Sequence, residues 1–479
     1  MKHYIWSFLN TILTRGFAFI FSIILGNILL PGDLGLYVTV VLVITYFANI
    51  LSLNLGSGII HKLNNQNEQQ FRNNYFTAGF IYILAFSLVG TLIFLGLKSL
   101  IAQIFDISEA RYVLNLVFML IPVNMLRIFF LHLMQSEMEF KKLTFINLSA
   151  VLVQTVVSVL LVYLGYNLEG VFYGLYSGQT LGLLLVSLMV FKRFRFILNK
   201  ETQRKAPVLI KFSSIIFVGS IAVLLDRRVD MLFVAHYLDK STVAVYSYAL
   251  KFSLFFLLVG NSFSRVSYPR FSKAFSDGSN TALERIFQYS IDFSFLFITI
   301  TSMIFLFNAE PIIGWLLPPY YLEAVPFLLI LFIGVVPQSV VSSTGTIFTA
   351  GGIPSVSAKI NWMLLALNVI LNFFLIPIYG LYGAAIATST TFLLKPALIF
   401  YLLSRKTEIK YTYTKLVAGF GIFIAFLFLG EALTSLYFKS LLIGVYTLLC
   451  VLYFLNKDER IYLSRNFSQV NKQVLSYLR

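Results

Sequence analysis

The chain consists of long apolar segments that recur along its whole length, with short polar breaks between them. A helix needs about 20 mostly apolar residues to cross a bilayer, and fourteen segments of this kind can be recognised. Hydrophobic residues make up 58% of the 479 residues and charged residues only 12%, whereas soluble domains are about 45–50% apolar and about 25% charged. We therefore predict an all-α polytopic membrane protein. This excludes a soluble enzyme, a secreted disulfide scaffold and a disordered chain.

The apolar runs predict where the transmembrane helices lie, with the uncertainty of a few residues that such boundaries carry. The predicted segments are 5–29, 36–60, 75–97, 112–134, 143–165, 170–191, 212–237, 242–262, 286–308, 322–344, 357–378, 381–403, 414–431 and 440–456. The first of them is too long for the core of a signal peptide and lacks a small-residue cleavage site, so we expect it to be retained.

Basic residues predict the orientation of the chain in the membrane. Four Lys and Arg residues fall in the odd-numbered loops, whereas most of the 36 fall at the N-terminus, in the even loops and in the tail. Cytoplasmic loops carry the excess of Lys and Arg, so we predict that both termini are cytoplasmic. The same rule accounts for the net charge of +16 without a nucleic-acid partner. The four exceptions are Lys98, Arg111, Lys240 and Lys439.

Several function classes lack the residues they would need. A membrane glycan polymerase needs a sizeable outer loop for its catalytic groups, and the outer loops here are short and poor in acids. The four histidines are scattered and have no metal-ligand spacing, so we predict no metal site. No Walker-A glycine loop is present. With one cysteine, an intrachain disulfide is impossible. The function class that remains is transport, driven by an energy source other than ATP hydrolysis by this chain.

An internal repeat indicates how the helices are grouped. Leu25–Tyr37 aligns with Val234–Tyr246, and Tyr166–Gly170 aligns with Tyr379–Gly383, at shifts of roughly 210 residues. Ile121-Pro122 aligns with Val336-Pro337 at a similar shift. Six helices bring the chain back to the side where it began, so the repeats are predicted to be parallel. Parallel repeats are related by an axis along the membrane normal, with the substrate path near mid-membrane between them.

The repeat sets the predicted domain boundaries. These are a first six-helix unit at 1–191, a cytoplasmic linker at 192–206, a second six-helix unit at 207–403, two further helices within 404–456, and a cytoplasmic tail at 457–479.

Two stretches resemble a known family. The segment Asn368–Thr388, with Pro377-Ile378-Tyr379-Gly380-Leu381-Tyr382-Gly383 at its centre, resembles the signature of the polysaccharide transporter family. Leu25–Tyr37, ending in Gly-Leu-Tyr, resembles that family's first-loop motif. The family includes the Wzx-type flippases of the multidrug/oligosaccharidyl-lipid/polysaccharide (MOP) exporter superfamily, together with lipid II flippases and MATE-type antiporters. The resemblance covers essentially the whole chain.

The resemblance implies a function. It implies a non-enzymatic flippase of the bacterial inner membrane that moves an undecaprenyl-diphosphate-linked oligosaccharide from the inner to the outer leaflet by alternating access. The oligosaccharide would be used for O-antigen, capsule or exopolysaccharide synthesis. A polysaccharide polymerase and a chain-length regulator are candidate partners of the protein. Related lipid II flippases are understood to use a cationic cavity with an arginine in helix 1, and Arg15 is the matching position.

Ionisable residues within the predicted spans are the candidate site residues, because charges at membrane depth are costly and usually face protein or water. Arginine holds phosphate oxygens bidentately and keeps its proton, so cations are the candidates for binding the diphosphate. Buried acids can carry H+ or Na+, so acids are the candidates for ion coupling. The cations are Arg15, Arg127, Lys251, Arg227 and Arg228, and the acids are Asp226, Asp230 and Asp292.

Structural roles compete with these functional ones. Arg227 and Asp230 are three apart on a helix and can neutralise each other, and Asp292 can pair with a cation of an adjacent helix. Lys395 is close enough to the cytoplasmic interface to snorkel. Polar side chains within the spans could contact sugar hydroxyls, although hydrogen bonds between helices are the more common use. These are Asn124, Gln154, Gln179 and Asn372.

Two alternative functions stay open. A cation-coupled MATE-type exporter of small amphiphilic compounds would be expected to have an acid-dominated cavity, whereas the charges within the spans here are mostly basic. A membrane glycan polymerase or acyltransferase would need a catalytic outer loop or a His pair in a span, and the sequence has neither.

Overall fold

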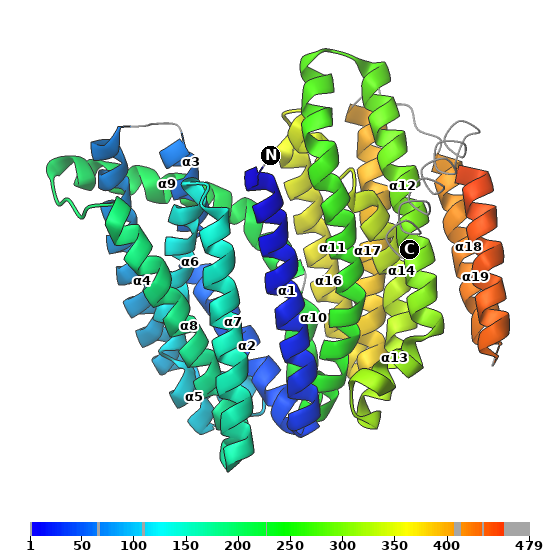
Figure 1. Ribbon diagram of the computed structural model, residues 1–479, viewed down its shortest axis with the longest axis horizontal. Coiled ribbons are helices and arrows are strands. Elements are labelled where there is room, and N and C mark those ends of the chain that lie inside the picture. Colours follow the sequence, from blue (N-terminus) through cyan, green and yellow to red (C-terminus); the bar gives the residue numbers. More distant parts are fainter. Residues whose placement is uncertain are drawn as a thin grey trace, which may run out of the picture. The chain divides into compact units, whose positions relative to one another are not determined.

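The computed structural model is helical, with no strand, over the residues it describes, which are 2–454 without 65–67, 108–110, 227, 407–412 and 434 (Figure 1). The predicted all-α membrane class is confirmed. The predicted tail at 457–479 lies outside the described residues.

Helices follow one another with short connections. The elements up to the middle of the chain are α1 (Lys2–Ile28), α2 (Pro31–Leu51), α3 (Leu55–Asn64), α4 (Gln69–Ile104), α5 (Arg111–Val117), α6 (Leu120–Ser136), α7 (Phe140–Leu161), the π-helical turn η1 (Val162–Tyr166), α8 (Asn167–Arg193), α9 (Lys200–Asp226) and α10 (Val229–Tyr237). Those that follow are α11 (Lys240–Ser276), α12 (Asn280–Phe307), α13 (Ala309–Leu316), the 3-10 helix η2 (Pro319–Ala324), α14 (Val325–Ser342), α15 (Ile347–Ala350), α16 (Pro354–Tyr379), α17 (Leu381–Lys406), α18 (Tyr413–Glu431) and α19 (Leu436–Phe454).

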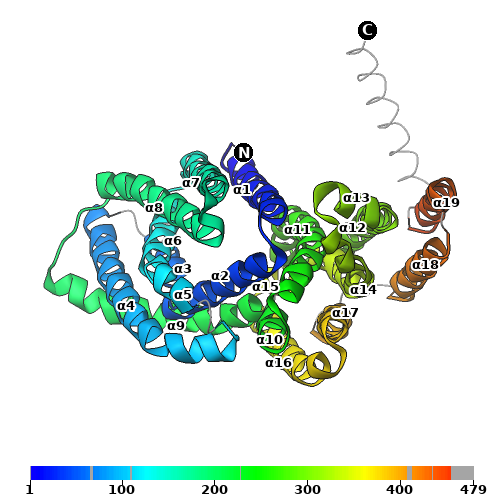
Figure 2. The same cartoon turned by 90° about the horizontal axis from the view of Figure 1, so that it is seen from below.

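The described chain contains 13 segments long and apolar enough to cross a membrane. One of them, 140–193, is 54 residues long and holds both α7 and α8, which pack side by side (Figure 2). The chain reverses between them at Gly165 and Asn167, whose φ angles are 92° and 40°. The sequence predicted two spans here, at 143–165 and 170–191. The total of fourteen and the orientation stay predictions.

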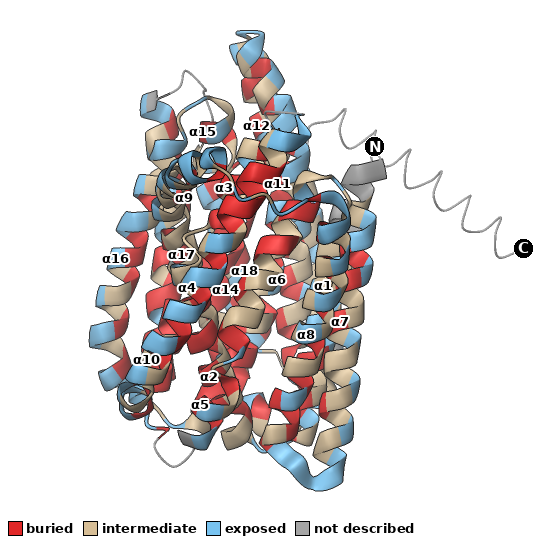
Figure 3. Cartoon of the chain, turned by 90° about the vertical axis from the view of Figure 1, so that its left-hand side faces the viewer, coloured by how far each residue is buried: buried red, intermediate tan, exposed pale blue. Residues whose placement is uncertain are grey.

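Exposed apolar side chains are consistent with a lipid environment. Leu88 and Leu92 on α4 are 57% and 68% exposed, and Figure 3 shows exposed residues along the length of this helix. A soluble monomer rarely leaves a large contiguous apolar surface open to water. The outer face of α4 is therefore a lipid-facing surface.

The helices group into two compact units. Unit 1 comprises residues 1–247 with 316–320 and 372–381, and unit 2 comprises 248–315, 321–371 and the chain from 382 onward. The first helix of the predicted second repeat, α9, packs against α3 and α4 of unit 1. It begins at Lys200, within the predicted linker. The repeat at 1–191 and 207–403 stays a prediction.

Three predicted spans of unit 1 are interrupted. The span 212–237 is divided into α9, which ends at Asp226, and α10, which begins at Val229. The span 36–60 is divided into α2 and α3, because Leu53 and Asn54 have left-handed backbones with φ of 45° and 53°. The span 112–134 is divided into α5 and α6. Pro122 has no N–H to donate to the carbonyl four residues earlier, and the helix breaks just before it. Tyr176 of α8 donates its hydroxyl to the carbonyl of Leu116 near this break.

A row of glycines brings α7 and α8 into close contact. Four glycines recur at every fourth position of α8, and such spacing places them on one face. A Cβ at Gly178 would lie 2.5 Å from the carbonyl oxygen of Ala150 on α7. Small residues let helix backbones approach closely in membranes. The four are Gly170, Gly174, Gly178 and Gly182.

This contact gives a testable expectation for folding. We expect Gly178→Ala to lower the free energy of unfolding by about 1–3 kcal/mol, because backbone atoms of α7 must shift. Gly96→Ala on α4 is the matched control, since nothing lies within 4 Å of its Cβ. Thermal unfolding in detergent measures both. Equal effects of the two variants would contradict the close contact.

Candidate functional site

The polar centre of unit 1 is formed around Arg127 on α6. Its Nη1 donates to Oε1 of Gln179 on α8 at 2.6 Å, and its Nη2 donates to Oδ1 of Asn147 on α7 at 2.9 Å. Asn147 in turn donates to Oδ1 of Asn10 on α1 at 3.3 Å. We call these four residues the Arg127 cluster. Its three amides are neutral, so these contacts orient the guanidinium without cancelling its charge.

The guanidinium of Arg127 has donors to spare. Arginine has five N–H donors, and two are used by Gln179 and Asn147. Its Nε is buried and has no hydrogen-bond partner among the described residues. A Cβ at position 182 would lie 2.5 Å from this Nε, so Gly182 leaves the space that the guanidinium occupies. The guanidinium is therefore held in place by neutral partners, and its described contacts do not cancel its charge.

Helix α1 joins this cluster through Asn10, which lies five residues before Arg15. Thr14 donates its hydroxyl to Oδ1 of Asn10 at 3.2 Å, and Arg15 follows Thr14 directly. Arg15 is exposed. The structure thus places the predicted Arg15 and Arg127 in the same unit, on helices that a chain of amide contacts connects.

The predicted cation Lys251 lies in unit 2. It is half-buried on α11, with its Nζ 4.5 Å from the centre of the Tyr248 ring. An ammonium over an aromatic face is attracted by the ring's quadrupole.

The charged stretch before α10 is described in part. Arg227 and the side chain of Asp226 lie outside the described residues. Arg228 is exposed at the N-cap of α10. Asp230 is buried and accepts a hydrogen bond from the hydroxyl of Tyr246 at 2.9 Å. The expected pairing of Arg227 with Asp230 therefore stays a prediction, and Tyr246 is a partner that the sequence did not indicate.

Asp292 is held by a cation from the C-terminal helices. Lys415 of α18 lies 3.3 Å from its Oδ2, and the same ammonium donates to the carbonyl oxygen of Phe454 on α19 at 2.9 Å. One cation thus connects α12, α18 and α19. The structural alternative expected for Asp292 is present, and Lys415 would compete with a coupling ion for this carboxylate.

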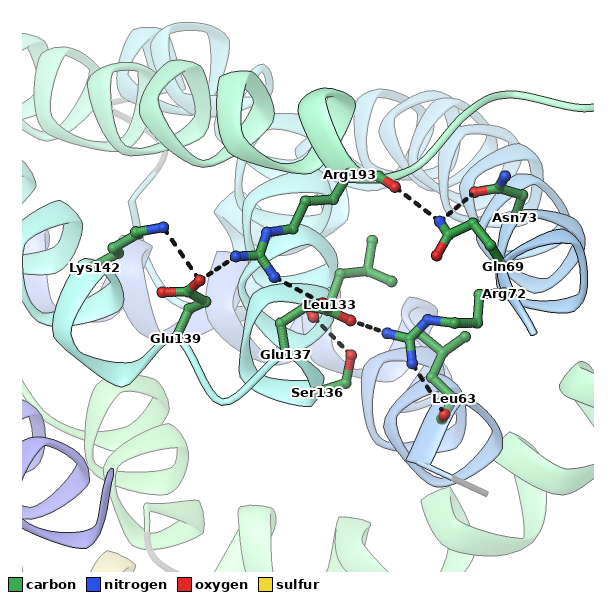
Figure 4. A network of polar contacts seen from close by, with 10 residues as sticks. All are labelled: Leu63, Gln69, Arg72, Asn73, Leu133, Ser136, Glu137, Glu139, Lys142 and Arg193. Atoms are coloured by element: carbon green, nitrogen blue, oxygen red, sulfur yellow. Dashed lines mark hydrogen bonds and ion pairs between the residues drawn. The ribbon is translucent and has the colours of Figure 1, made fainter. Parts of the chain in front are cut away.

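A second ionic network lies at one end of unit 1 (Figure 4). Glu137 accepts from Arg72 of α4 and from Arg193 of α8, and the Arg193 contact is 2.8 Å. Glu139 accepts from Arg193 and from Lys142. Met138 between the two acids has a φ of 54°. The network connects α4, α8 and the α6–α7 connection, so it fixes this end of the unit.

Sequence reasoning identified the cation of the cluster and missed most of its partners. Gln179 was named as a possible sugar contact, with a hydrogen bond between helices as the more common use, and in the structure it makes such a bond with Arg127. Asn10 and Asn147 were not singled out. The described residues contain no group of three or more His, Cys, Asp or Glu side chains that could hold a metal ion.

The fold is shared with known transporters. The lipid II flippase MurJ, in an inward closed conformation, has a TM-score of 0.71 over 95% of this chain and 97% of that chain, at 18% identity. An inward-facing multidrug resistance MATE family transporter of the MOP superfamily has a TM-score of 0.65 over 83% of this chain and 97% of that chain, at 15% identity. At these identities the likeness shows the fold alone. The protein is a multi-pass helical membrane protein with the MurJ and MATE fold.

Similarity in sequence shows which family the chain belongs to. Residues 24–326 match the family described as polysaccharide biosynthesis protein, and the chain belongs to that family. A probable low-salt glycan biosynthesis flippase of Haloferax volcanii is 26% identical over 257 residues. That alignment covers 54% of each protein, so the chain spans about half the length of this curated relative.

Proposed function

We propose that this protein is a flippase that moves a lipid-linked oligosaccharide from the cytoplasmic to the outer leaflet by alternating access. The observation that carries the proposal is the Arg127 cluster, in which neutral amides orient a half-buried guanidinium and leave its charge available. The family and the flippase named among its relatives support the same function.

The chemistry of the cargo explains why such a cluster is needed. A diphosphate is a strong anion, and an unpaired charge in an apolar medium costs many kcal/mol. A guanidinium offers several donors in a fixed plane that suits phosphate oxygens. In this proposal Arg127 and Arg15 receive the diphosphate in unit 1. Lys251, Arg227 and Arg228 are further candidates along its path.

The finer identity of the cargo is part of the proposal. We infer an undecaprenyl-diphosphate carrier and a bacterial inner-membrane location, with export for O-antigen, capsule or exopolysaccharide synthesis. A polysaccharide polymerase and a chain-length regulator would then act on the product. The protein itself makes or breaks no covalent bond in this scheme.

Ion coupling is the energetic part of the proposal. Asp230 is one candidate, because it is a buried acid that accepts hydrogen bonds from the Tyr246 hydroxyl and from a backbone N–H. Either H+ or Na+ would suit a carboxylate at membrane depth. Asp226 is a further candidate, and at Asp292 the ion would compete with Lys415.

Reconstituted vesicles test the proposal. A fluorescent polyprenyl-diphosphate oligosaccharide is placed in the membrane, and an impermeant reductant reports its arrival in the outer leaflet. We expect Arg127→Gln to reduce the initial rate about 30-fold or more, because removing one partner of a buried charged contact costs about 2–5 kcal/mol. Arg15→Ala should reduce the rate as well. Arg270→Gln, an exposed cation of unit 2, is the matched control.

Two outcomes would overturn the proposal. One is a normal rate in the Arg127 and Arg15 variants at normal abundance, which would remove these residues from the path. The other is gradient-driven uptake of a cationic amphiphile such as ethidium without movement of the glycolipid, which would favour the MATE-type alternative.

A further inference from the structure

The connection between α8 and α9 is held firmly against unit 1. We call residues 194–199 the linker strap. The backbone N–H of Arg195 donates to Oδ1 of Asn73 at 3.0 Å, and that of Ile197 donates to Oγ1 of Thr77 at 3.0 Å. Phe194 is buried, with its ring centre 5.4 Å from that of Phe76. The strap is therefore a fixed part of the surface along α4.

The strap presents a mixed basic and apolar surface. Phe196 and Leu198 are 52% and 68% exposed, although both are large apolar side chains. Exposed cations flank the pair, with Lys192 and Arg195 before it and Lys200 and Arg204 after it. None of these cations is ion-paired with an acid in the described chain. We call the six residues the linker face: Lys192, Arg195, Phe196, Leu198, Lys200 and Arg204.

The linker face lies at the outer edge of unit 1. Both views show the strap and the start of α9 on the side of α4 that points away from the rest of the unit (Figures 1 and 2). Glu201 is the acid nearest in sequence, and its Oε2 accepts a hydrogen bond from Asn74 of α4 at 3.4 Å. Glu201 is exposed as well, so the face combines four exposed cations with one neighbouring exposed acid and is net positive.

We propose that the linker face is a binding surface for anionic phospholipids of the cytoplasmic leaflet. Basic residues beside a transmembrane helix attract anionic headgroups with about 1 kcal/mol each. Aromatic and aliphatic side chains among such cations enter the boundary between headgroups and acyl chains. Exposed cations on both sides of the apolar Phe196 and Leu198 match this boundary. An acidic protein would pair with the cations but would leave the apolar side chains without a lipid partner.

A local reporter tests the proposal. The natural tryptophans, Trp6, Trp315 and Trp362, are replaced by Phe, and F196W then places one indole in the linker face. The protein is reconstituted in phosphatidylcholine containing either brominated phosphatidylglycerol or brominated phosphatidylcholine, with bromines near the headgroup. We expect phosphatidylglycerol to be preferred at this indole about fivefold or more, since 1 kcal/mol per cation corresponds to that ratio. High salt should reduce the preference.

Variants separate this surface from general charge attraction. We expect R195Q/K200Q/R204Q to remove the preference for phosphatidylglycerol at the F196W indole. The matched control R270Q/K273Q/K359Q removes three exposed cations of unit 2 and should leave it unchanged. L448W, on the exposed face of α19, should show no preference.

Three results would overturn the proposal. The first is equal quenching of the F196W indole by the two brominated lipids. The second is an equal loss of the phosphatidylglycerol preference in both triple variants, and the third is quenching of the indole by aqueous iodide but by neither lipid. The salt titration needs no charge variant, so the proposal stays testable if the triple variant fails to fold.

Discussion

Replacing Gln179 with glutamate is expected to abolish transport while leaving the protein folded. Its Oε1 already accepts the Nη1 proton of Arg127 at 2.6 Å, so a carboxylate of nearly the same shape would form a charge-assisted pair there. Hydrogen bonds between charged groups are stronger than neutral ones. The pair would cancel the charge that the proposed mechanism uses. We expect a fall in the flipping rate of about 30-fold or more, with a thermal midpoint that is unchanged or higher.

This variant differs from the removal of Arg127 in an informative way. Arg127→Gln changes shape, packing and charge together, whereas Gln179→Glu changes the charge of the cluster and little else. Asn147→Asp, at the other amide, should repeat the effect because Asn147 accepts from Nη2 at 2.9 Å. The exchange R127Q/Q179R keeps one cation at the contact and should restore most of the transport.

The measurement combines the vesicle assay with thermal unfolding in detergent. A normal flipping rate for Gln179→Glu would show that the charge of Arg127 is not used by the cargo. A lower thermal midpoint would show that a carboxylate does not fit at position 179 beside Arg127. Asn147→Asp would then test whether transport depends on the charge of Arg127.

The sequence was sufficient to predict helices and insufficient to predict where they break. Apolar runs of about 20 residues imply membrane spans, and each predicted span has a helix in the structure. The division at Leu53 and Asn54 depends on two left-handed backbones at non-glycine residues, which have no reliable signal in composition. Pro122 did carry a signal, since a proline inside a helical pattern ends or kinks it.

Only the charged residues of the candidate site could be predicted from the sequence. Arg127 stands out because an arginine is rare in an apolar run, whereas Asn147 and Gln179 resemble many other helical amides. Pairing them requires knowledge of how α6, α7 and α8 pack, which the composition of each helix does not contain. Arg72 and Arg193 show the same limit. They served to predict orientation, yet in the structure both bind Glu137.

Replacing Asp292 with alanine is expected to have the largest effect on stability. Its partner Lys415 would then remain as an uncompensated, partly buried ammonium. Removing one member of a buried ion pair costs about 3–5 kcal/mol, whereas replacing both members with apolar residues is often neutral or stabilising. We therefore expect D292A to unfold at a clearly lower temperature than the unmodified protein, and D292A/K415M to recover most of the loss. Thermal unfolding in detergent measures both.

The double variant also decides what Asp292 does. If its role is to attach α18 and α19 to α12, D292A/K415M should be stable and should flip the cargo at a rate close to normal, with an unchanged dependence on H+ or Na+ gradients. If Asp292 carries the coupling ion, the same variant should be stable while its rate no longer responds to the gradient. D277A, at an exposed acid of unit 2, should change the free energy of unfolding by less than about 0.5 kcal/mol. If D292A lowers the free energy of unfolding no more than D277A does, the pair with Lys415 does not hold these helices together. A desolvated ammonium that has lost its carboxylate partner should destabilise the fold by more than that.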